Sequence, residues 1–160
     1  AMTTLSFERG TALVSELLKT IQLCRDVAEL AKHITRGSAT AWDDAGFRLD
    51  VGRLTAELDA LWALTKRNIS EATRTGLVGA GGNVFKLAYT ELRHRLGELA
   101  MRLIERAGLS QDDAGELATA KHLSGRFHAM AMSIAAGTTQ VQRNIIAERL
   151  LGLPKEPRFS

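Results

Sequence analysis

The sequence predicts an all-α fold, most simply an up-down four-helix bundle with an additional C-terminal helix. Apolar residues recur three and four positions apart in successive segments, which is the spacing that lines one face of an α-helix. Prolines, which break helices, number only two in 160 residues, and no stretch alternates apolar with polar residues as a strand does. A chain of this length is expected to form one domain.

The first two helices end at clear stop signals. Leu5 to Arg36 is expected to be one long helix that stops at Gly37, followed by a turn-rich connection over 37–44. Its apolar seam consists of Val14, Leu17, Ile21, Cys24, Ala28 and Ala31. Asp43 or Asp44 can cap the second helix, which Gly76 ends. Its apolar stripe consists of Phe47, Val51, Leu54, Leu58, Leu61 and Leu64, widened by Trp62.

The third helix follows a glycine-rich segment, 79–82, that is typical of a flexible linker. It is expected to begin near Asn83 and to close at Gly108, with charges from Lys86 to Arg106 on solvated faces. Its inward side chains are expected to be Phe85, Ala88, Leu92, Leu96, Leu99 and Leu103. Across the first three helices, seven residues are predicted to be buried: Leu17, Ile21, Leu58, Leu61, Leu92, Leu96 and Leu99.

Two further helices complete the predicted bundle. Ser110 with Asp113 indicates a capping box for a fourth helix, whose packing residues would be Leu117, Leu123, Phe127, Met130 and Ile134. Thr138 or Thr139 can cap the fifth helix, which Gly152 and Pro154 stop. Its apolar residues at helical spacing are Val141, Ile145, Ile146 and Leu150.

Composition excludes several classes of function. The net charge of +3 comes from 21 basic and 18 acidic residues without a basic run, so a nucleic-acid partner is not expected. No apolar stretch approaches the ~20 residues that span a bilayer, and the single cysteine, Cys24, favours a reducing, cytoplasmic setting. Cys24 lies on an apolar seam and is expected to pack rather than react. The spacing of His122 and His128 does not favour a metal site.

The chain is expected to divide at its ends. Residues 1–2 are typical of an expression scar, residues 3–154 form the bundle, and residues 155–160 form a tail. Thr3 would then begin either a short natural protein or a fragment of a longer one.

The stretch from Ile134 to Pro154 carries a family resemblance. It contains G-T-T-Q-V-Q-R-N-I-I-A-E-R-L-L-G-L-P, which resembles the closing signature of the acyl-CoA dehydrogenases. Lys86-Leu-Ala-Tyr-Thr-Glu-Leu, with Leu99-Ala100, resembles the K-L-x-x-x-E-L run of bacterial members, and Asp43-Asp44 leading to Arg53-Leu-Thr-Ala-Glu resembles their second helix. The likeness covers nearly all residues from Leu5 to Pro154.

The resemblance implies a part of a larger flavoenzyme. Complete members have an N-terminal helical domain, a middle β-domain and a C-terminal bundle, and they form oligomers through these bundles. They bind FAD, desaturate the α,β bond of an acyl-CoA thioester and pass electrons to an electron-transfer flavoprotein. The chain would be the C-terminal bundle and would be inactive alone.

Glu8 has two interpretations. A carboxylate in the first helical turn interacts favourably with the helix dipole, by ~0.3–1 kcal/mol. The resemblance adds another, because Leu5-Ser-Phe-Glu-Arg9 resembles the L-x-x-E-R of isovaleryl-type members, whose catalytic base is that Glu. Other members place the base directly before the Gly-Thr, where this chain has Ala136. The resemblance thus implies Glu8 as catalytic base, Arg9 as a substrate-binding residue, and Thr138 and Gln140 as the flavin-binding residues.

Two departures from the family pattern favour a rival interpretation. The R-x-x-F-G motif that reaches a neighbouring subunit's flavin is not found between Ile34 and Leu54, and no G-G-x-G follows the third helix. The chain could instead be a non-catalytic helical subunit or interaction bundle of a heteromeric dehydrogenase. The resemblance is compatible with a homo-oligomer and with a hetero-oligomer.

Overall fold

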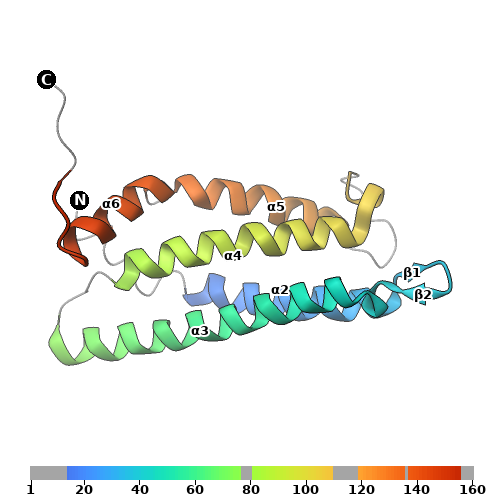
Figure 1. Cartoon of the computed structure of the whole chain (residues 1–160), viewed down its shortest axis with the longest axis horizontal. Helices are drawn as coiled ribbons and strands as arrows, with labels where there is room; N and C mark the ends of the chain where they lie inside the picture. The colour runs from blue at the N-terminus through green and yellow to red at the C-terminus, as the bar shows by residue number, and fades with distance from the viewer. Residues whose placement is uncertain (1–13, 77–80, 110–118, 136, 156–160) are drawn as a thin grey trace, which may run out of the picture.

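The computed structural model describes residues 14–76, 81–109, 119–135 and 137–155. Within these ranges the chain is an up-down bundle of long helices, as predicted (Figure 1). The helices are α2 (Val14–His33), α3 (Ala45–Thr75), α4 (Gly81–Ile104), α5 (Thr119–Ile134) and α6 (Thr139–Arg149). α2 and α3 lie side by side, α4 and α5 run along them, and α6 packs at the end of the bundle where α4 begins (Figure 1).

The connection between α2 and α3 is more ordered than a simple turn. Two short antiparallel strands, β1 (Thr35–Arg36) and β2 (Ala39–Thr40), pair around Gly37, whose φ of 66° lies in the left-handed region. A 3₁₀ helix, η1 (Ala41–Asp43), follows, and Asp43 accepts hydrogen bonds from Thr40. Asp44, the second of the two predicted caps, accepts from the backbone N–H groups of Gly46 and Phe47 and begins α3.

The segment 79–82 is not wholly a linker, because Gly81 and Gly82 already belong to α4. A Cβ at Gly81 would collide with the amide end of the Asn68 side chain on α3, which would have to move to make room. At its other end, α4 stops at Ile104 rather than at Gly108, and Glu105–Leu109 form a 3₁₀ helix, η2. Gly76, the predicted stop of α3, occupies a left-handed C-cap with a φ of 68°.

The core lies where α2, α3 and α4 meet. Six of the seven residues predicted to be buried are buried, and Ile21 packs partly buried against them. α4 also contacts α5 and α6, so it is surrounded on several sides. For this reason the prediction that its charges all lie on solvated faces was wrong: Lys86 and Arg93 are buried.

The apolar stripes of α5 and α6 do not all face the core. Phe127, Met130 and Ile134 were expected to pack inward but are exposed, and Val141 of α6 and Leu150, its C-cap residue, are also exposed. The buried positions of these helices are instead Thr119, His122, Ala129 and Gln142. The predicted capping residues Ser110 and Asp113, and Leu117, lie outside the described residues, as does the predicted start of the first helix at Leu5.

Candidate functional site

The start of α6 is the part of the described chain where predicted site residues and tight geometry coincide. We call Gly137, Thr138, Thr139 and Gln140 the Gly137 turn. Thr138 caps α6, because its Oγ1 accepts a hydrogen bond from the backbone N–H of Val141 at 3.3 Å. Gly137 has a φ of 98°, a conformation that disfavours any residue with a side chain.

Two buried polar side chains hold this turn, Lys86 from α4 and Gln142 from α6 itself. Lys86 Nζ donates to the carbonyl of Gly137 at 2.9 Å, and Gln142 Nε2 donates to the same carbonyl at 3.4 Å. Lys86 and Gln142 are both fully buried. On the outside, Arg143 pairs with Glu91 of α4 at 3.0 Å. The turn is therefore fixed in position by contacts from both its inner and its outer side.

The fixed turn presents polar groups outward. Thr138 is partly buried and Gln140 is exposed, so the two predicted flavin-binding side chains lie at an accessible surface. The first backbone N–H groups of a helix have no acceptor within the helix, and its N-terminus carries a partial positive charge. These donors suit the electronegative carbonyl or phosphate oxygens of a flavin nucleotide.

Sequence reasoning missed Lys86 and Gln142 as parts of this site. Both occupy positions within the motifs that carried the family resemblance, so the signal was present in the pattern. The charge alternation along α4 instead assigned Lys86 to a solvated face. Glu8, Arg9 and Ala136 lie outside the described residues.

Other reactive groups are held in unreactive environments. Cys24 is buried with its Sγ 3.8 Å from Thr55 Oγ1, and burial raises the pKa of its thiol, as expected for a packed cysteine. Burial likewise raises the pKa of Tyr89, whose hydroxyl lies 3.5 Å from Thr20. Among the described residues no group of three His, Cys, Asp or Glu side chains is placed to hold a metal ion, and no helix is long and apolar enough to cross a membrane.

Comparison with known proteins places this bundle in a family. Residues 1–151 match the family model described as "Acyl-CoA dehydrogenase, C-terminal domain". The chain is 39% identical over 161 residues to acyl-CoA dehydrogenase IpdE1 of Mycobacterium tuberculosis and 35% identical over 156 residues to IpdE1 of Mycolicibacterium smegmatis. These alignments cover 99% and 98% of this chain but only 38% and 36% of the relatives' length.

Solved structures share the fold. A crystal structure of an FAD-dependent dehydrogenase superposes with a TM-score of 0.81 at 16% identity, over 94% of this chain and 38% of that one. The ChsE4-ChsE5 complex from Mycobacterium tuberculosis superposes with a TM-score of 0.72 at 25% identity, over 86% of this chain and 36% of that one. The bundle, its closing signature and the family match agree: the chain belongs to the acyl-CoA dehydrogenase family and corresponds to its C-terminal domain.

Proposed function

We propose that this domain serves a flavin-dependent enzyme that desaturates the α,β bond of an acyl-CoA thioester. The observation that supports this most is the Gly137 turn, which the buried Lys86 fixes in place while Gln140 stays exposed. A fixed, donor-rich turn can orient a cofactor without reorganising when the cofactor binds. FAD, when bound, supplies the hydride acceptor for the reaction.

The chain's own residues take distinct roles in this proposal. The Thr138 hydroxyl accepts from Val141 and keeps its own hydrogen to donate to the flavin, and the Gln140 amide supplies a second polar contact. Glu8 removes the α-proton of the thioester as general base, and Arg9 contacts the substrate. Because a β-domain must supply the remaining walls, the isolated chain is expected to desaturate no acyl-CoA.

The decisive experiment replaces Glu8 by Gln in the complete enzyme. The substitution keeps the shape and removes the base, and a general base typically contributes about 10²–10⁴-fold. We expect kcat to fall at least about a hundredfold with flavin still bound. Glu29→Gln is the matched control, because Glu29 is an exposed carboxylate on α2 that pairs with Lys32. This variant should keep normal turnover. Near-normal turnover of Glu8→Gln would leave Glu8 only a carboxylate at a helix start.

Flavin binding is tested separately at the Gly137 turn. Gln140→Ala should lower the flavin content seen in the absorbance spectrum of the purified complete enzyme. Asn144→Ala, an exposed change on the same helix, should leave the flavin content unaltered. Equal flavin content in both variants would remove Gln140 from the cofactor site.

A second candidate function is that of a helical subunit in a heteromeric dehydrogenase. The similarity to the ChsE4-ChsE5 complex favours this function, because that structure joins two different proteins. The missing R-x-x-F-G motif also favours it. Flavin bound only after mixing with a partner subunit would support this function. In either form, we expect electrons to pass to an electron-transfer flavoprotein and the enzyme to act in the cytoplasm.

Self-association is part of the same proposal. Phe127, Met130 and Ile134 form an exposed apolar stripe along α5, and such surface is unfavourable in water unless another surface covers it. We expect the chain to form an oligomer through its helices, most simply a two-fold dimer. Light scattering at tens of micromolar protein should report the dimer mass, and a monomer would count against it.

A further inference from the structure

Arg93 of α4 is a buried cation that has no counter-ion among the described residues. The residue as a whole is only 8% exposed. Its Nη2 donates to the carbonyl of Gly125 at 3.4 Å, and its Nε finds no hydrogen-bond acceptor in the described part of the chain. It takes part in none of the ion pairs among the described residues. A buried guanidinium in this state is costly, because its desolvation is not offset by an opposite charge.

The guanidinium lines a groove between α2 and α5. The groove has a volume of about 570 Å³, within the range of about 300–1,000 Å³ that is usual for small-molecule sites. Ser124, Lys19 and Lys121 contribute further donors, and Gly125 covers the guanidinium without a side chain. A Cβ at Gly125 would lie 3.7 Å from Arg93 Nη2, directly beside the group that a ligand would need to reach.

The other charges of this groove already have partners. Glu16 pairs with Lys19 at 2.7 Å and lies 3.7 Å from His128. Asp26 pairs with Lys121 at 3.0 Å, and Gln22 donates to it at 2.8 Å. Since each carboxylate is matched by a neighbouring cation, Arg93 is the surplus positive charge of the groove.

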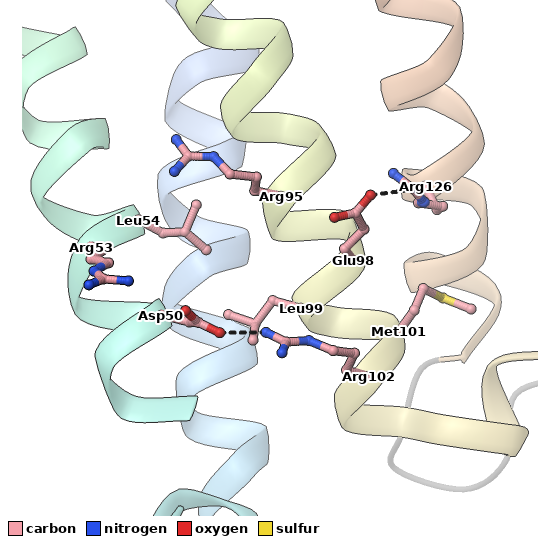
Figure 2. A pocket seen from close by; sticks show the side chains of 9 residues that line it. All are labelled: Asp50, Arg53, Leu54, Arg95, Glu98, Leu99, Met101, Arg102 and Arg126. Carbon is pink, nitrogen blue, oxygen red and sulfur yellow. Dashed lines mark hydrogen bonds and ion pairs between the residues drawn. The ribbon is translucent and has the colours of Figure 1, made fainter. Parts of the chain in front are cut away.

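A second groove, between α3, α4 and α5, shows the opposite state (Figure 2). There Arg102 pairs with Asp50 at 2.6 Å and Arg126 pairs with Glu98 at 3.1 Å, as Figure 2 shows. Arg95 pairs with Glu57, and Arg53, which makes no ion pair with a described residue, is exposed to water. The charges of this groove are therefore balanced or hydrated, and its arginines need no ligand.

We propose that the groove between α2 and α5 binds an oxyanion, the carboxylate or phosphate group of a small molecule, with Arg93 as its direct ligand. A guanidinium presents its Nε–H and Nη–H in a planar fork that matches two oxygens of such a group. Bound there, the anion satisfies the unpaired Nε and neutralises the buried charge. Ser124 and Lys19 lie on the lining of the same groove and can contact the remaining oxygens.

The test titrates inorganic phosphate and, separately, acetate into the chain at constant ionic strength. Calorimetry should detect binding of at least one anion. The melting temperature of the protein should rise by about 3 °C or more when the anion concentration is ten times the dissociation constant. Arg93→Met should weaken binding at least about tenfold and should raise the melting temperature without anion, because it removes a buried unpaired charge. Arg93→Lys, which keeps the charge and loses the fork, should also bind more weakly.

Arg126→Met is the matched control, because Arg126 is an equally long but ion-paired side chain on the other groove. It should lower the melting temperature and leave anion binding unchanged. Binding of phosphate alone assigns a phosphorylated ligand, and binding of acetate alone assigns a carboxylate. If neither anion binds, or if Arg126→Met weakens binding as much as Arg93→Met, the proposal is overturned. No flavin or turnover enters the measurement, so the result is independent of the enzyme function proposed above.

Discussion

The two sides of the central helix α4 differ in what they bury. On the side of α2 and α3, apolar side chains such as Leu17, Leu58 and Leu96 meet in one continuous core. On the side of α5 and α6, the buried set includes polar Thr119, His122 and Gln142, while Phe127 and Ile134 lie outside. The first side is built to hold the fold together. The second is built to position polar groups, and it leaves apolar surface uncovered.

The largest expected effect tests whether the apolar core carries the stability. Leu96→Ala should destabilise the fold by about 2–5 kcal/mol, because Leu96 is fully buried and its loss leaves a cavity. Leu151→Ala, the control just after α6, should change stability by less than about 0.5 kcal/mol, since Leu151 is 64% exposed and lies outside the α5 stripe. Urea unfolding followed by circular dichroism measures both. Similar losses of stability in the two variants would contradict the idea that the apolar side of α4 carries the stability of the fold.

A medium effect is expected from the helix caps, one on each side. Asp44→Ala removes the acceptor for two N–H groups at the start of α3 and should lower global stability by about 1 kcal/mol. Thr138→Ala removes the cap of α6. Within the described residues, the extensive packing of α6 is against α4. We expect its effect to be local, with faster amide exchange in the first turn of α6 and little change in the global transition. Equal global losses would show that α6 unfolds together with the core.

The smallest effect concerns the buried His122. Burial is the main cause that lowers its pKa, the positive charge of Lys121 lowers it further, and the negative charge of Asp26 opposes both. Because the folded state holds this group neutral, the unfolded chain binds more protons, and stability is lost as pH falls through the unfolded value of about 6.5. His122→Gln should lose less stability than the parent between pH 7.5 and pH 5.5. His33→Gln, at an exposed position, should behave like the parent. Parallel losses in all three proteins would show that His122 makes no contribution.

Local signals in the sequence predicted most of the fold, because they act through neighbours in the chain. Asp44 caps α3 and Gly76 ends it, since capping and left-handed geometry depend on a few adjacent residues. The seam of α2 and the stripe of α3 were also predictable, because each of these helices buries mainly one face. The pairing of β1 with β2 was missed, because strands of two residues show no alternation.

The same reasoning failed where burial depends on partners distant in the sequence. Lys86 and Arg93 lie on a helix that contacts each of the other described α-helices, so charge alternation along it no longer indicates which side faces water. The spacing of Phe127, Met130 and Ile134 correctly marked one face of α5, but spacing cannot say whether this chain covers that face. The candidate site was predictable in part: the motif indicated Thr138 and Gln140, whereas the lysine behind the turn required the fold.

The hydrogen bond from Lys86 to the Gly137 carbonyl also sets an order for folding during synthesis. Residue 137 leaves the ribosome 51 residues after its donor, when α2, α3 and α4 have already been made. Domains form largely as they are synthesised, so the early helices can collapse around Leu17 and Leu96 before this acceptor exists. Packing on the far side of α4 must wait for the later segment. The proposed cofactor turn is therefore completed late, after the core that carries it.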